Sequence, residues 1–194
     1  FKVDYTPIDG EIIDLGRLAT LGNKGVLALM SDSTNAERKG YTMSESTVGD
    51  VLDKLFVNCT KRIVVATFSS NVHRVQQIVN SAVKYKRKIA VCGRSMCNMI
   101  ETARKFGYIK VPDNVFIDID SIKSYADDNL VIITTGSQGE PMSALTRMAA
   151  GEHKKVQITP NDLIIISANP IPGNEKYISK VIDDLMGIGA EVIY

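Results

Sequence analysis

The stretch from Thr134 to Ala149 reads TTGSQGEPMSALTRMA, and it follows the apolar run LVII at residues 130–133. An apolar run of this length, bounded by turn residues, predicts a buried strand, and the residues after Pro141 read as a helix. We expect Pro141 in the first helical turn, where a backbone N–H has no partner within the helix. A plain connection needs only one turn residue. The loop GSQGE therefore raises the possibility of a ligand beside the strand end.

The same alternation of strand and helix runs through the chain. Helical stripes separate the expected strands, with further helices expected at Ile13–Leu21 and Val48–Phe56. The expected strands are mostly apolar on both faces, as parallel strands covered by helices are. They are Val26–Ser31, Ile63–Thr67, Ile89–Cys92, Leu130–Thr135, Leu163–Ala168 and Glu191–Tyr194. This order predicts an α/β fold with an open, mostly parallel sheet and helices on both faces.

Composition narrows the class of protein. The chain has 194 residues, of which 44% are hydrophobic and 23% charged, and its net charge is +1. The hydrophobic and charged fractions are typical of a globular domain. The small net charge provides no overall positive potential that would attract nucleic acid. No apolar run approaches the roughly 18 residues of a membrane-spanning helix. Because the chain opens within a strand-like segment and without an initiator methionine, we expect a piece of a longer protein.

The chain has three cysteines, Cys59, Cys92 and Cys97. Their odd number and the lack of a CxxC pattern favour a reducing, cytosolic compartment and buried free thiols. The two histidines, His73 and His153, are not spaced to complete a metal site with them. We therefore expect no zinc site from these residues alone.

Polar loops follow several of the expected strands, and we expect three of them to lie at one edge of the sheet: Ser31–Asn35, Phe68–Asn71 and Gly136–Glu140. Ligands of open α/β sheets bind beyond the carboxyl ends of the strands, and helix N-termini there favour an anion such as phosphate. The candidate phosphate-binding residues are Ser69, Ser70, Asn71, Arg74, Gly136, Ser137, Gln138 and Glu140. For one loop alone, turn and cap roles suffice, but several loops at one edge favour a binding site. Neither GxGxxG nor GxxxxGK[ST] occurs in them, so a dinucleotide site or a P-loop is not supported.

Two acidic motifs leave more than one interpretation open. Asp32 follows the expected strand Val26–Ser31, where a carboxylate serves either catalysis or an Asx turn or helix cap, with neither favoured. The Asp118-Ile119-Asp120 motif is of the kind found in phosphotransferases that use an aspartyl nucleophile. Here Asp120 and Ser121 form a good helix cap, and we favour that interpretation.

Five segments together resemble a known family. They are FKVDYTP at residues 1–7, LMSDSTNAE at 29–37, ATFSSNVHRVQQI at 66–78, TTGSQGEPMSAL at 134–145 and SANPIPGNE at 167–175. The chain resembles the β-CASP region of ribonuclease J, within the metallo-β-lactamase nuclease superfamily. This resemblance implies a split architecture. Residues 1–40 would end the first metallo-β-lactamase segment, and residues 41–194 would form the inserted β-CASP domain.

The resemblance also implies chemistry. The full-length parent would be a zinc-dependent ribonuclease with two zinc ions, acting as a 5′-to-3′ exonuclease and an endonuclease. This fragment would hold no metal and would be inactive alone. Asp32 matches the family's motif A carboxylate, which orients a histidine outside this chain. Ser69, Ser70, Asn71, Ser137 and Gln138 would face RNA.

The implied partners are RNA with a 5′-monophosphate end and further copies of the parent in a homo-oligomer. No membrane partner is implied, and the implied location is cytoplasmic. The alternative function is that of a nucleotide- or phosphosugar-binding α/β domain without a nuclease role, or of a domain that docks partners. A His-x-His-x-Asp-His motif encoded upstream of Phe1 in the parent gene would separate the nuclease from these alternatives.

Overall fold

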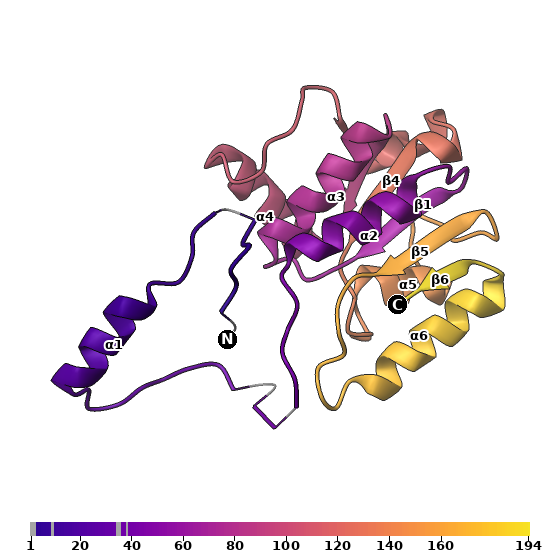
Figure 1. The fold of residues 1–194 in the computed structure, drawn as a ribbon. Coiled ribbons are helices and arrows are strands. Elements are labelled where there is room, and N and C mark those ends of the chain that lie inside the picture. Colours follow the sequence, from indigo (N-terminus) through magenta and orange to yellow (C-terminus); the bar gives the residue numbers. More distant parts are fainter. Residues whose placement is uncertain (1–2, 9, 34–35, 38) are drawn as a thin grey trace.

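The structure, a computed structural model, describes residues 3–8, 10–33, 36–37 and 39–194. It confirms the expected α/β class. Six strands form one parallel sheet in the order β3-β2-β4-β1-β5-β6 (Figure 1). Their bounds are β1 Arg62–Ala66, β2 Lys88–Cys92, β3 Phe116–Ile117, β4 Leu130–Thr134, β5 Asp162–Ile166 and β6 Glu191–Ile193.

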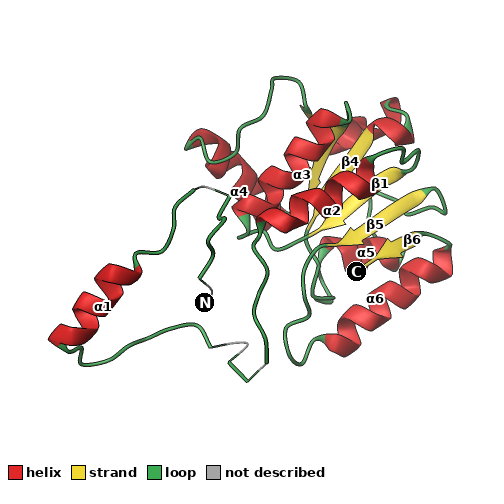
Figure 2. Cartoon of the chain, in the orientation of Figure 1, coloured by secondary structure: helices red, strands yellow, loops and turns green. Residues whose placement is uncertain are grey.

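Helices cover both faces of the sheet (Figure 2). One face carries α2 (Ser46–Phe56), α3 (Val72–Lys84) and α4 (Arg94–Lys105), which pack on alternate residues of the strands such as Ile63, Val65 and Ile133. The other face carries α5 (Ala144–Ala149) and α6 (Glu175–Ile188). Two 3-10 helices, η1 (Ile119–Ser124) and η2 (Asp127–Asn129), lie between β3 and β4. Strands β4 and β5 are buried throughout because both of their faces are covered.

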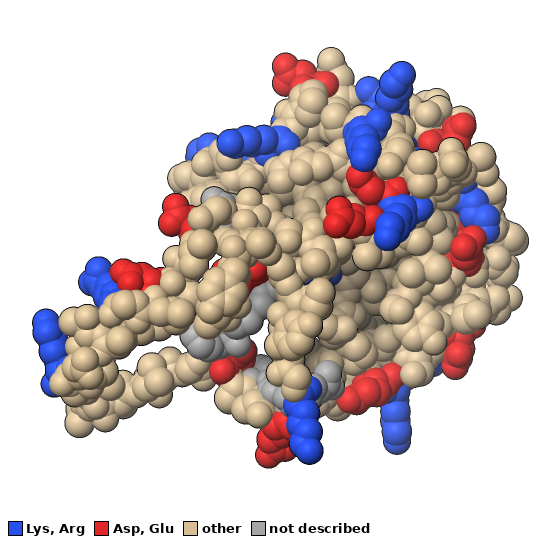
Figure 3. Space-filling model, in the orientation of Figure 1, with Lys and Arg blue, Asp and Glu red and all other residues tan. Residues whose placement is uncertain are grey.

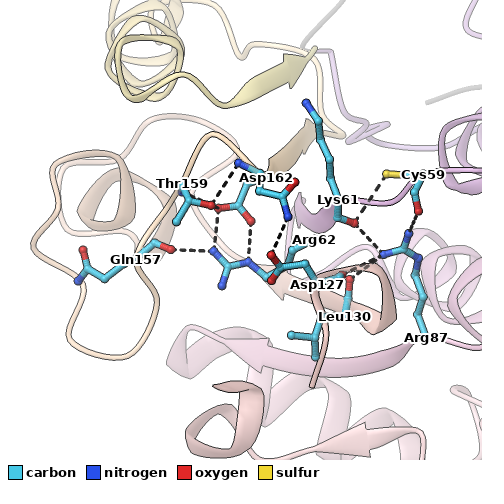
Figure 4. Close-up of polar contacts among 10 residues, drawn as sticks. Cys59, Lys61, Arg62, Arg87, Asp127, Leu130, Gln157, Thr159 and Asp162 are labelled. Atoms are coloured by element: carbon cyan, nitrogen blue, oxygen red, sulfur yellow. Dashed lines mark hydrogen bonds and ion pairs between the residues drawn. The ribbon is translucent and has the colours of Figure 1, made fainter. Parts of the chain in front are cut away.

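Polar contacts close the amino-terminal edge of the sheet (Figure 4). Arg62 donates two hydrogen bonds to the Asp162 carboxylate, from Nε to Oδ1 at 2.6 Å and from Nη2 to Oδ2 at 2.7 Å. Arg87 is buried and donates to the backbone carbonyls of Cys59, Lys61 at 2.9 Å and Leu130 at 3.2 Å. These bonds join the starts of β1, β4 and β5, so this edge is occupied by the protein's own groups. The loops that follow β1, β4 and β5 lie at the opposite, carboxyl edge.

The N-terminal part of the chain forms an arm beside the α/β body (Figure 1). Its one described helix, α1 (Leu15–Lys24), buries no residue. The expected strand Val26–Ser31 is wrong, since these residues form coil and the side chains of Leu27 and Leu29 are exposed. A strand needs a neighbour to bond its backbone groups, and no described residue offers one here.

The expected start of the helix after β4 is also wrong. Pro141 lies in a turn in which Ser143 N donates to Glu140 O at 2.9 Å, and α5 begins at Ala144. The N-cap is Ser143, whose hydroxyl accepts from Thr146 N. A serine satisfies the first free N–H groups of a helix better than a proline supports its first turn, so the helix starts after the serine. Among the described residues, no helix is long and apolar enough to cross a membrane.

Candidate nucleic-acid interface

The loops after β1, β4 and β5 meet at the carboxyl edge of the sheet. Thr67 N donates to Thr134 O at 3.2 Å, and Ser167 N donates to Ala66 O at 2.8 Å. The Thr67 hydroxyl donates to Ser167 O at 3.2 Å. The expectation that Phe68–Asn71 and Gly136–Glu140 share one edge is therefore confirmed. The parallel register is the reason, since Ala66 pairs with both Thr134 and Ile166.

Asn71 and Arg74 are fixed at the start of α3. The Asn71 side chain is the N-cap and accepts from Arg74 N at 3.0 Å. The Arg74 guanidinium forms an ion pair with Glu45 and donates to the carbonyl and hydroxyl oxygens of Ser167 at 2.7 and 2.8 Å. Arg74 thus joins α3, the residue before α2 and the loop after β5. Its role as a phosphate contact stays a prediction, and it would require Arg74 to share its donors with a ligand.

Gln138 holds two loops of this edge together. Gln138 is 2% exposed, and its side-chain Oε1 accepts from Ile171 N at 2.7 Å while Nε2 donates to Asn169 O at 3.0 Å. Ser137 is buried as well. In this conformation neither side chain faces solvent, so contact with RNA through them requires a movement of the loop. Ser70 and Glu140, by contrast, are exposed.

The two glycines of this loop allow close packing. Gly136 has a φ of 105° and Gly139 a φ of 70°, which other residues rarely adopt. A Cβ atom on Gly139 would lie 2.5 Å from the carbonyl carbon of Tyr177 in α6. Gly139 therefore lets the loop lie against α6, and Gly136 lets it lie against Ser143 and Leu145. Gln138 joins the loop to the segment after β5. Much of the unusual composition of this loop is explained by packing inside the protein.

A histidine and a cysteine meet beside the loops, although no sequence pattern links them. His153 Nε2 lies 3.1 Å from Cys92 Sγ, across 61 positions of sequence. His153 Nδ1 accepts from Val156 N at 3.0 Å, so the ring proton is on Nε2 and points at the sulfur. Burial lowers the pKa of His153, helped by Arg147 and Lys155. Burial also raises the pKa of the Cys92 thiol.

The pair is therefore a neutral imidazole and a thiol, which pins the segment after α5 to the end of β2 and is not set up as a nucleophile. The expectation of buried thiols holds for Cys92, but it is wrong for Cys97, which is exposed in the first turn of α4. A helix presents its first turn to solvent wherever no neighbouring element covers it. Within the described ranges, no three His, Cys, Asp or Glu side chains form a group that could hold a metal ion.

Asp32 is not at the sheet edge. Residues 31–33 lie exposed on the N-terminal arm, and the expectation that they follow a strand of this sheet at its carboxyl edge is wrong, because residues 26–31 form coil (Figure 1). Residues 34 and 35 of the same expected loop lie outside the described residues. The role of Asp32 as an orienting carboxylate stays a prediction. The acidic motif at residues 118–120 has the expected cap function, but with Asp118 as the capping side chain, which accepts from Asp120 N at 2.7 Å.

The charges on the surface are mixed. Figure 3 shows lysines and arginines interspersed with acidic side chains over the visible face, without a broad area of one sign. This fits the net charge of +1. Binding of an anion at the carboxyl edge would therefore depend on local donors, such as backbone N–H groups and a few side chains.

Comparison with known proteins places this geometry in a family. A family model described as the ribonuclease J β-CASP domain matches residues 60–185. The chain belongs to the ribonuclease J β-CASP family. The match covers β1 to most of α6, including the loops after β1, β4 and β5.

Curated ribonuclease J proteins match the chain over its whole length. One from Synechocystis is 52% identical over 194 residues, and one from Helicobacter pylori strain 26695 is 50% identical over 194 residues. The protein named ribonuclease J2 from Bacillus subtilis is 47% identical over 195 residues. The chain covers 30%, 28% and 35% of the length of these three relatives. This β-CASP chain thus corresponds to about a third of each of them.

Proposed function

We propose that this chain is the RNA-clamping β-CASP portion of a metal-dependent ribonuclease, with the carboxyl edge of its sheet facing the RNA. The observation that carries the proposal is the family match over residues 60–185. Support comes from the loops after β1, β4 and β5, which meet at that edge and include the start of α3, an anion-favouring helix end.

The place where the N-terminal arm joins the body also supports the carboxyl edge as the interface. Ser44 donates to Asp4 Oδ2 and to Thr6 O, both at 2.9 Å, so the two ends of the arm lie together. The next residue, Glu45, contacts Arg74 and Asn71 at the carboxyl edge. The arm therefore joins the body beside the candidate interface. We infer that the rest of the parent sits here, with residues 1–40 ending its first metallo-β-lactamase segment and residues 41–194 forming the β-CASP domain.

The apolar face of α1 fits this arrangement. Leu15, Leu18 and Leu21 are spaced along one side of the helix and are each about 43–44% exposed. An exposed leucine stripe of this kind is stable when another surface covers it. In the proposal, the metallo-β-lactamase part of the parent covers it.

The metal centre belongs to the parent. Two zinc ions would supply a hydroxide nucleophile and stabilise negative charge on the phosphate. The side chains of the described residues do not fit such a centre, so its ligands are proposed to lie in other segments of the parent. Asp32 would act there by orienting a histidine, without binding metal itself.

The remaining proposals concern the parent's reaction and setting. We propose 5′-to-3′ exonuclease and endonuclease action on RNA with a 5′-monophosphate end, and a homo-oligomeric parent. A cytoplasmic location is proposed from the free thiols of Cys59, Cys92 and Cys97, because thiols persist in a reducing compartment.

The test compares three samples for zinc content and cleavage of a 5′-monophosphorylated RNA. They are this chain, the full-length parent, and the parent with Asp32→Ala. We expect no stoichiometric zinc and no cleavage for the chain, and full zinc with reduced turnover for the variant. Metal-dependent cleavage by the chain alone would contradict the proposal that this chain clamps RNA while other segments of the parent hold the metal. Unchanged turnover of the variant would remove Asp32 from the mechanism.

A further inference from the structure

A groove runs along the β3 side of the sheet, and the loops after β1, β4 and β5 do not line it. It has a volume of about 790 Å³ and lies between α4, the segment that follows it and β3. Its floor is apolar and is formed by Val91, Ile100, Ile109, Val111, Phe116 and Ile117. Four of these floor residues, Val91, Val111, Phe116 and Ile117, are only partly buried. The floor therefore keeps apolar surface that a partner can cover.

The rim of this β3-edge groove is positively charged. Arg104, Lys105 and Lys110 line it, against the single acid Glu101. All four are exposed, and none of the three cations forms an ion pair with a described residue. An apolar centre within a polar rim is the usual anatomy of a protein–protein contact, and the sign of this rim selects an acidic partner.

The sheet edge in the groove is also incomplete. Ile89 N donates to Val115 O at 2.9 Å, so Val91, two residues further along β2, presents its backbone to the same side. Strand β3 ends at Ile117, opposite Ala90. On this side the Val91 carbonyl meets the Cys97 thiol at a sulfur–oxygen distance of 3.9 Å, which is a weak contact. A carbonyl at the end of a two-residue edge strand is an acceptor for the N–H of an added extended segment.

We propose that the β3-edge groove is a docking site for an extended peptide segment of a partner protein in which apolar and acidic residues alternate. Apolar side chains of the segment cover the floor, acidic side chains meet Lys105 and Lys110 at the rim, and a backbone N–H reaches Val91 O. Alternation follows from the two-residue period of an extended chain, which sends successive side chains to opposite sides.

Single-stranded RNA is the weaker occupant on the same observations. RNA binding uses exposed aromatic rings on which bases stack. The ring on the groove floor, Phe116, is covered by Arg104, whose guanidinium carbon lies 5.1 Å from the ring centre. The exposed rings nearby, Phe106 and Tyr108, do not line the groove. The rest of the floor is aliphatic, which offers apolar contact to side chains and no stacking to bases.

The test uses a short fluorescein-labelled peptide that alternates valine with glutamate, and a second that alternates valine with lysine. Binding to the chain is followed by fluorescence anisotropy. We expect saturable binding of the acidic peptide only, weakened about tenfold by each of Lys105→Glu and Lys110→Glu. The matched control, Lys54→Glu, reverses an exposed charge on α2 outside the groove and should leave binding unchanged.

A second readout reports the place of binding. Cys97 lines the groove and is exposed, whereas Cys92 is buried. The acidic peptide should slow alkylation of Cys97 by iodoacetamide, as measured by mass spectrometry. Equal binding of both peptides, or binding unaffected by the two groove variants, overturns the proposal. So does a labelled oligouridine that loses affinity in these variants while the acidic peptide fails to bind.

Discussion

Replacing Gln138 by leucine tests whether this side chain holds the carboxyl-edge loops together. Leucine keeps most of the volume and removes the acceptor for Ile171 N at 2.7 Å and the donor to Asn169 O at 3.0 Å. Each hydrogen bond of this kind contributes about 1 to 1.5 kcal/mol net. We therefore expect Gln138→Leu to lower the free energy of unfolding by about 2 to 3 kcal/mol.

A matched control is available in α3. Gln76 makes the same pair of backbone contacts, accepting from Lys110 N at 2.7 Å and donating to Lys110 O at 2.9 Å, but in an exposed setting. Water replaces those bonds when Gln76 is changed to leucine. The expected cost of Gln76→Leu is therefore less than about 1 kcal/mol.

Two measurements check the difference. Urea unfolding gives the free energies of the wild type and both variants. Hydrogen exchange of the Ile171 amide reports the loop directly, and it should accelerate at least about tenfold in Gln138→Leu only. A cost for Gln138→Leu no greater than that for Gln76→Leu, with unchanged exchange at Ile171, would refute the reasoning.

Three further outcomes are expected. Burial lowers the pKa of His153 in the folded chain, so as pH falls through about 6.5 the histidine takes up a proton in the unfolded chain before it does so in the folded chain. This uptake favours the unfolded chain. Unfolding free energy should therefore decrease between about pH 7.5 and 5.5, and His153→Gln should reduce that slope in urea titrations. Gly139→Ala should cost more than about 2 kcal/mol through φ strain and collision with α6, whereas Gly107→Ala, with open space at its Cβ, should cost about 1, as measured by urea unfolding. Limited proteolysis should cut residues 3–43 before residues 51–194, because α1 buries no residue, and equal cutting would contradict this.

The sequence alone predicted the sheet and the layers on it. Apolar runs such as Ile63–Val65 and Leu130–Ile133 are read as parallel strands because burial on both faces leaves no alternation of polar residues. The position of Phe68–Asn71 and Gly136–Glu140 at one edge follows from the same rule, since parallel strands end at the same side. The family resemblance rests on long motifs, and three of them include the loops that follow β1, β4 and β5.

Tertiary structure decided what those motif residues do. The sequence marks Gln138 as a polar side chain in a loop, but only the approach of residues 169–174 turns it into a buried bridge. Arg74 is committed to Glu45 and Ser167 for the same reason. The Cys92–His153 contact spans 61 positions, a distance over which no local pattern operates.

The errors have a common physical cause. Val26–Ser31 has the composition of a strand, yet it forms coil, because backbone hydrogen bonds require a partner that the described residues do not supply. Cysteine is usually a core residue, but Cys97 lies on an exposed side of α4. The sheet edge beneath it is short, because β3 pairs with β2 at only two positions. Local sequence determines what a segment can form. Neighbours distant in sequence decide whether a strand finds its pairs and whether a side chain is covered.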